Sequence, residues 1–204
     1  MKKALLIVDV QNDFLPGGSL AVANGNEIIP IINSIQSKFD FIVATQDWHP
    51  ANHKSFAANH ENQIPFNVIN LNGLEQVLWP VHCVQGSVGS AFSKDLNTDK
   101  VSAIIRKGMD VETDSYSGFF DNRKQNNTGL LGLLRDKNIQ EVYVCGLAAD
   151  YCVYFTAKDA AENGFKTFYI EDTVRAISED NYKQAKKKLQ KLQVTFIKSS
   201  QLKK

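Results

Sequence analysis

Residues 141–153 decide the fold, and they read EVYVCGLAADYCV. Glu141 to Leu147 is a short apolar run, which is typical of a strand buried on both faces. From Asp150 to Asn163, apolar side chains then recur on one face of a helical pattern. A strand, a tight turn and a helix in immediate succession indicate one unit of an α/β fold.

The same alternation continues in both directions along the chain. Further short apolar runs predict strands at Ala4–Val8, Phe39–Ala44, Val101–Ile105, Lys166–Ile170 and Val194–Ile197. Helical patterns occupy Glu27–Ser37 and Leu130–Lys137, and Ser178 is a cap residue that opens a last helix. The pattern predicts a three-layer α/β/α fold, in which helices cover both faces of a mainly parallel six-stranded sheet.

Length and composition narrow the class of protein. The 204 residues favour one domain, residues 1–204, with ordinary hydrophobic (43%) and charged (22%) fractions. Because the formal net charge is only +1 and no basic stripe is present, we expect no nucleic-acid partner. Residues 48–100 lack a long periodic segment and hold all four histidines and both tryptophans, which predicts a functional, metal-binding loop region.

The cysteines and the apolar segments predict a cytoplasmic protein. Cys83, Cys145 and Cys152 are odd in number and form no Cys-x-x-Cys pair, so a disulfide framework is not expected. The apolar run Ala4–Val8 is shorter than the core of about 7–15 residues in a signal peptide. No apolar stretch approaches the roughly 20 residues that span a bilayer, so no membrane partner is expected.

Reactive side chains follow four of the predicted strands. Asp9 ends the first strand, Asp47 and His49 follow the second, and Lys107 follows the third. Cys152 lies just past the fourth, at a helix start. Because ligands of open α/β sheets bind at the carboxyl ends of the strands, these groups are expected to share one pocket.

Cys152 is the candidate nucleophile, although a lone cysteine in a helix is more often a packed thiol. Amides of the first helical turn favour anions, so we expect them to lower the thiol pKa and to form an oxyanion hole. Asp9 is the candidate base, and the Lys107 charge would hold both groups in register.

A second group of residues has the pattern of a metal site. Asp47 and His49 lie one residue apart in an extended segment, so both can reach one ion, and His82 could supply a third ligand. Three protein ligands leave open positions for water or substrate. The alternative is that these are ordinary hydrogen-bonding loop histidines. His53 and His60 are expected at the surface, with a fourth ligand as the alternative.

The motifs around these residues resemble the isochorismatase-like cysteine hydrolases. Residues 7–14, IVDVQNDF, are similar to the opening motif of that family, residues 105–108, IRKG, to its lysine strand, and residues 146–153, GLAADYCV, to its nucleophile motif. Residues 45–53, TQDWHPANH, residues 79–83, WPVHC, and residues 116–121, YSGFFD, resemble the branch that acts on nicotinamide. One departure is Ala149, which stands where that family often has threonine.

The resemblance implies a mechanism and a site. Asp9, assisted by Lys107, would deprotonate Cys152, the resulting thioester would be hydrolysed, and the amides of Ala148 and Cys152 would hold the oxyanion next to a cis peptide bond near Leu147–Ala148. The metal ligands would be Asp47, His49 and His82, which would hold zinc, iron or manganese. The aromatic ring of the substrate would lie among Phe14, Trp79 and Tyr116. The implied activity is hydrolysis of nicotinamide to nicotinate and ammonia in NAD salvage, with pyrazinamide as a second substrate and homo-oligomers plausible.

Two other functions are compatible with parts of the pattern. One is another amidase of the same family, acting on a carbamoyl or ureido group, which would need no metal. The other is a non-catalytic protein in which the metal is structural and Cys152 is a redox-sensing thiol. The presence of a nucleophile, a base and a lysine argues against the second, and the Asp/His/His cluster argues against the first.

Overall fold

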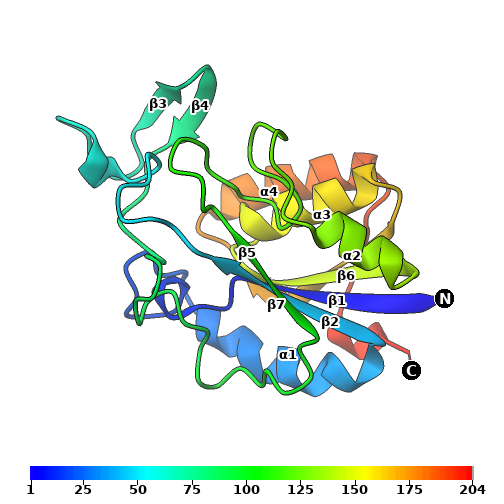
Figure 1. The fold of residues 1–204 in the computed structure, drawn as a ribbon. Helices are drawn as coiled ribbons and strands as arrows, with labels where there is room; N and C mark the ends of the chain where they lie inside the picture. The colour runs from blue at the N-terminus through cyan, green and yellow to red at the C-terminus, as the bar shows by residue number, and fades with distance from the viewer. Residues whose placement is uncertain (204) are drawn as a thin grey trace.

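A six-stranded sheet, parallel throughout, forms the centre of the computed structural model, which describes residues 1–203 (Figure 1). In spatial order its strands are β5 (Ala103–Lys107), β2 (Phe41–Asp47), β1 (Lys2–Val8), β6 (Ile139–Leu147), β7 (Lys166–Arg175) and β8 (Thr195–Ile197). Every neighbouring pair is parallel. The predicted fold class is therefore confirmed, with a sheet that is entirely parallel.

Helices cover both faces of this sheet. Helix α1 (Ile28–Ile35) lies on one face, and α2 (Leu130–Asp136), α3 (Cys152–Glu162) and α4 (Glu179–Lys191) lie on the other (Figure 1). Ser178 caps α4 as expected, because its hydroxyl accepts a hydrogen bond from the Asn181 amide. Within residues 1–203, no helix combines the length and the apolar character that crossing a bilayer requires.

Strand β1 shows why the sheet is buried on both sides. Its side chains alternate: Leu5 and Ile7 pack on the α1 side, and Leu6 and Val8 pack against the cluster formed with α2, α3 and α4. All four are fully buried. A central strand of this kind has no solvated face, which is why it appears in the sequence as an unbroken apolar run.

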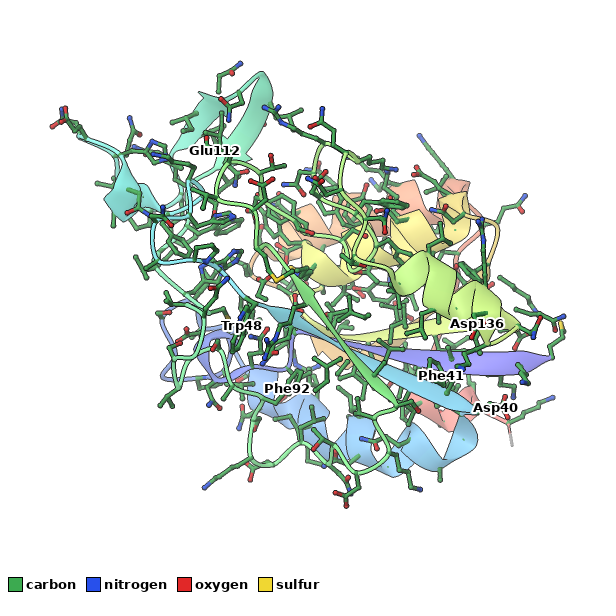
Figure 2. The ribbon with its side chains drawn as sticks, viewed as in Figure 1. Asp40, Phe41, Trp48, Phe92, Glu112 and Asp136 are labelled. Atoms are coloured by element: carbon green, nitrogen blue, oxygen red, sulfur yellow. The ribbon has the colours of Figure 1, made fainter. Side chains whose placement is uncertain are left out.

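The order of the strands creates a site at one end of the sheet. The chain passes from β1 outward to β2 and β5, and then returns to place β6 on the other side of β1. The direction of winding therefore reverses between β1 and β6, and a crevice forms beyond their carboxyl ends. Figure 2 marks the polarity of β2, with Asp40 and Phe41 at its start and Trp48 just past its end.

The structure differs from the sequence-based boundaries in a few places. Strand β5 begins two residues later than predicted, and β7 continues to Arg175 because the charged residues Glu171 and Asp172 interrupt its apolar pattern without ending the strand. The hairpin of β3 (Val68–Leu71) and β4 (Leu74–Val77) was not predicted. Its turn, Asn72-Gly73, has positive φ at both residues and is a typical hairpin signal.

Gly146, near the end of β6, allows β1 and β6 to approach closely. Its φ is +113°, and a Cβ atom there would lie 2.0 Å from the Val8 carbonyl oxygen. We predict that Gly146→Ala lowers the free energy of unfolding by at least about 2 kcal/mol, measured by urea denaturation. The control Gly132→Ala lies in α2 with open space around its Cβ, and it should gain about 0.5–1 kcal/mol. Equal stabilities would contradict the close approach.

Candidate active site

The carboxyl ends of three strands bring Asp9, Lys107 and Cys152 together. Asp9 follows β1 with φ of +48°, Lys107 is the last residue of β5, and Cys152 begins α3. The Lys107 Nζ lies 2.9 Å from Asp9 Oδ2 and 3.5 Å from Cys152 Sγ. All three residues are buried. The structure thus brings together the candidate nucleophile, the candidate base and the cation that the sequence suggested separately.

Three oxygen acceptors fix the position of the Lys107 ammonium group. Its ammonium group contacts the carboxylates of Asp9 and Asp47 and donates a 3.0 Å hydrogen bond to the Ser115 carbonyl oxygen. The second oxygen of Asp9 accepts a 2.6 Å hydrogen bond from the Thr45 hydroxyl. A buried ammonium with this many partners stays charged, and its orientation is determined by them.

The pKa values of this cluster reflect burial first and charge second. Burial raises the pKa of Asp9, and the nearby Lys107 only partly offsets this effect. Burial acts in the same direction on Asp47, but Lys107 and His49 outweigh it and hold the pKa of Asp47 well below its usual value. The two carboxyls therefore differ, and Asp9 is the more basic of the pair.

Burial also raises the pKa of the Cys152 thiol well above its usual value, Lys107 only partly offsets this effect, and the negative charges of Asp9 and Asp47 add to it. The sequence-based expectation of a lowered thiol pKa is therefore wrong. A thiol with a raised pKa needs a neighbouring base to accept its proton before it can attack.

The turn before α3 leaves backbone amides without a protein acceptor within the described part of the chain. The peptide bond between Leu147 and Ala148 is cis, as the resemblance implied. The amides of Tyr151 and Val153 both donate to the Ala148 carbonyl oxygen. Among residues 1–203, by contrast, the amides of Ala148 and Cys152 donate to no protein acceptor. Two free donors beside a nucleophile are suited to binding an oxyanion.

Asp47, His49 and His82 form a buried cluster next to this group. Their potential ligand atoms all lie within 4.8 Å of one another. The Nε2 atoms of His49 and His82 lie 3.5 Å and 3.8 Å from Asp47 Oδ2. Each ring has its Nδ1 atom 2.8 Å from a backbone carbonyl oxygen, of Gly108 and Pro80 respectively.

The hydrogen bonds of these rings suit a metal site. A carbonyl oxygen can only accept, so Nδ1 carries the proton in each neutral ring, and Nε2 presents its lone pair toward the Asp47 carboxylate. Backbone acceptors of this kind commonly orient metal-binding histidines. Three converging donors, one carboxylate and two imidazoles, fit a divalent zinc, iron or manganese ion with open positions.

His53 forms a second group of potential ligands with His49 and Asp114, whereas His60 and Cys83 belong to no such group within residues 1–203. His53, expected at the surface, is fully buried, and the Ser55 amide donates to its Nδ1 atom. The surface expectation was wrong because the 48–100 region packs His53 against the His49 ring, with ring centroids 4.5 Å apart. His60 is half-buried, and its Nε2 atom lies 2.7 Å from the Lys54 carbonyl oxygen. Cys83 is buried, and desolvation raises its pKa far above the usual value.

An aromatic pocket joins the two groups of residues. Phe14, Trp79 and Tyr116, which the resemblance suggested as ring contacts, all line it together with Cys152, Ala148 and the Asp/His/His cluster. The Trp79 ring lies edge-on to Tyr116, with centroids 6.2 Å apart, and Phe14 lies edge-on to His82 at 5.5 Å. A flat ring bound in this pocket would face the Asp47-His49-His82 cluster. A carbonyl carbon attached to that ring would face the Cys152 thiol.

Four pocket residues were not predicted from the sequence: Leu20, Asp114, Tyr151 and Ile177. The ring centroids of Tyr151 and Trp79 lie 4.8 Å apart. Because Tyr151 directly precedes Cys152 in the sequence, it could have been predicted as a pocket residue. Leu20 and Ile177 are isolated apolar residues in loops, and their role depends on packing between distant segments. No local pattern marks such residues.

The profile of the Isochorismatase domain matches residues 3–201. The chain belongs to the isochorismatase family. Within this family, the nicotinamidase of Acinetobacter baylyi is 48% identical over 174 residues, which cover 85% of this chain and 81% of that protein. A nicotinamidase and pyrazinamidase from Acinetobacter baumannii has a solved structure that is 47% identical, with a TM-score of 0.97, covering 99% of this chain and 98% of that one.

Two more distant members of the isochorismatase family have been solved with ligands. The yeast nicotinamidase, bound to the inhibitor nicotinaldehyde, is 34% identical with a TM-score of 0.91, and the match covers 96% of this chain and 99% of that one. The pyrazinamidase of Pyrococcus horikoshii, in complex with zinc, is 36% identical with a TM-score of 0.79, covering 97% and 99%. The ligands named are therefore a pyridine aldehyde and a metal ion.

The buried ion pairs of Lys107 yield a prediction about stability. In metal-free protein, Lys107→Met removes the cation that two buried carboxylates share, so the free energy of unfolding measured by urea denaturation should fall by about 3–5 kcal/mol. The control Lys124→Met removes a half-exposed lysine that also contacts two carboxylates, Asp159 and Glu162, and should change stability by less than about 1 kcal/mol. Similar losses in both variants would argue against the central role of Lys107.

Proposed function

We propose that this protein hydrolyses nicotinamide to nicotinate and ammonia, and that it also deamidates pyrazinamide. The observation that carries the proposal is that Cys152 shares one aromatic pocket with the Asp47-His49-His82 cluster, while Lys107 contacts both Asp9 and the Cys152 sulfur next to that pocket. The first group can attack an amide, and the second can hold a pyridine ring. The nicotinamidases and pyrazinamidases of the same family, similar over most of the chain, support this assignment.

Asp9 acts as the general base in the proposed mechanism. Its raised pKa makes it a suitable acceptor for the Cys152 thiol proton, and the Lys107 ammonium stabilises the thiolate that results. The thiolate attacks the carboxamide carbon, and the amides of Ala148 and Cys152 donate to the oxygen as it becomes negative. Asp9 then returns the proton to the departing ammonia, which leaves a thioester on Cys152.

Water completes the reaction. Asp9, ionised again, accepts a proton from a water molecule that attacks the thioester carbonyl, and the same two amides stabilise the second oxyanion. The carbon–sulfur bond breaks, Cys152 recovers its proton, and nicotinate leaves. Lys107 remains positively charged throughout, because its acceptors raise its pKa well above the usual value despite its burial.

Asp47, His49 and His82 are the residues that would hold a divalent metal ion, with zinc the first candidate. When bound, the ion would accept the pyridine nitrogen and so orient the ring. Phe14, Trp79 and Tyr116 would contact the ring and exclude water. The solved family member that holds zinc supports this choice of metal. A carbamoyl or ureido substrate has no ring nitrogen and would make no use of this cluster, so nicotinamide is the better fit.

A reducing compartment such as the cytoplasm suits this chemistry, because Cys152 must remain a free thiol. All three cysteines are unpaired and buried. The cluster of metal ligands also has an open side toward the pocket, whereas a structural zinc site is usually closed by four protein ligands. This arrangement favours the enzyme over a redox-sensing protein.

The nucleophile is tested by replacing two buried cysteines in turn. Cys152→Ala should lower ammonia release from nicotinamide by at least about 10³-fold, because no other side chain can form the thioester. Cys145→Ala is the matched control, because this thiol only donates to the Leu6 carbonyl oxygen within the sheet, and its activity should stay near that of the unmodified protein. Full activity in Cys152→Ala would refute the mechanism.

The metal site is tested through Gly108, whose φ is +67° and whose Cβ, if present, would lie 2.4 Å from His49 Cε1. Gly108→Ala must displace the His49 ring, so we expect zinc affinity, measured by chelator competition, to fall about 10–100-fold. Gly86→Ala is the control, with φ of +75° and open space around its Cβ. Gly86→Ala places alanine at a similar positive φ but causes no contact with a neighbouring side chain, so this variant should bind zinc like the unmodified protein. Equal affinities would place the metal elsewhere.

A further inference from the structure

The side chain of Gln11 makes an unusual pair of hydrogen bonds with the backbone of one residue. Its Oε1 atom accepts from the Asp47 amide at 2.8 Å, and its Nε2 atom donates to the Asp47 carbonyl oxygen, also at 2.8 Å. Nε2 also donates to the Ser90 carbonyl oxygen at 2.8 Å. Gln11 is fully buried, so water does not compete for these bonds.

The course of β1 explains why Asp47 needs a side-chain partner. The pairing of β1 with β2 ends at Ile7 and Ala44, three residues before Asp47. Beyond this point β1 turns away, because Asp9 has a positive φ and the Gln11 amide bonds back to the Asp9 carbonyl oxygen. On the other edge of β2 the pairing with β5 continues as far as Asp47 and Lys107.

Asp47 therefore lies at a strand end that has a partner strand on one side only. In a parallel strand, the amide and carbonyl of one residue point to the same neighbour. The amide and carbonyl of Asp47 point to the side where β1 no longer pairs with β2. The carboxamide of Gln11 makes the two hydrogen bonds that a continued β1 would have made there. One donor and one acceptor satisfy both backbone groups and limit rotation of the Asp47 backbone.

We propose that Gln11 is a positioning residue for Asp47, which sets the affinity of the metal site and, through it, the binding of substrate. This inference rests on the proposed function, because it takes Asp47 as a metal ligand. The position of the Asp47 carboxylate relative to His49 and His82 depends on its backbone, and metal ligands must be held within about 0.5 Å. Gln11 also follows Asp9 by two residues, so it joins the segment of the base to the metal cluster.

Gln46 provides a closely matched comparison. Its Nε2 atom donates to the same Ser90 carbonyl oxygen at 2.9 Å, and its Oε1 atom accepts from Arg106 at 3.3 Å. Gln46 is also buried, but its side chain makes no hydrogen bond to the Asp47 backbone within residues 1–203. A change at Gln46 thus removes a buried glutamine and its bond to Ser90 while it leaves the support of Asp47 intact.

The experiment compares Gln11→Met with Gln46→Met in the full chain, stripped of metal by a chelator and titrated with zinc against a chromophoric competitor. We expect Gln11→Met to weaken zinc binding about 10–100-fold, as the loss of ligand-orienting bonds does elsewhere, and Gln46→Met to bind like the unmodified protein. With zinc below saturation, KM for nicotinamide should rise in Gln11→Met. Saturating zinc should restore most of kcat.

A second variant covers the case in which Gln11→Met fails to fold. Gln11→Asn keeps a buried carboxamide but is one methylene too short to reach both groups of Asp47, so it should also weaken zinc binding. Equal zinc affinity in the folded Gln11 variants and in Gln46→Met would overturn the inference. Failure of the proposed function would appear separately, as an unmodified protein that binds no zinc or releases no ammonia from nicotinamide.

Discussion

The site depends on one buried cation between two buried carboxylates. Lys107 contacts Asp9, which belongs to the chemical half of the site, and Asp47, which belongs to the cluster that would hold a metal. Removing either carboxylate would leave the ammonium short of a partner in a region that water does not reach. The two halves therefore form one electrostatic unit, and neither can be altered without changing the charge balance of the other.

This unit exists because the strands end at different points. β1 leaves the sheet early, β2 and β5 stay paired as far as Asp47 and Lys107, and β6 ends in a turn that opens α3. Close contact between β1 and β6 requires Gly146, and this contact places the segment after β1, with Asp9, beside the turn that leads to Cys152. Side chains from segments far apart in the chain thus converge at the reversal of winding, where an open α/β sheet binds its ligands.

The sequence allowed much of this to be predicted, because buried parallel strands are continuous apolar runs and the reactive residues follow them directly. Asp9, Asp47 and Lys107 could be picked out by position alone. Gln11 could not, because its role depends on where β1 separates from β2, and no local pattern encodes that separation. The buried position of His53 and the raised pKa of Cys152 were also missed, since both follow from tertiary burial.

The burial and the raised pKa of the Cys152 thiol affect how easily the enzyme is inactivated by oxidation. Peroxides and alkylating agents react with thiolates, and they need access to the sulfur. Cys152 is only 7% exposed, and burial raises the pKa of its thiol. The sulfur is therefore shielded from oxidation to sulfenic acid in two ways, because it is hardly accessible and because its raised pKa keeps the thiolate fraction low.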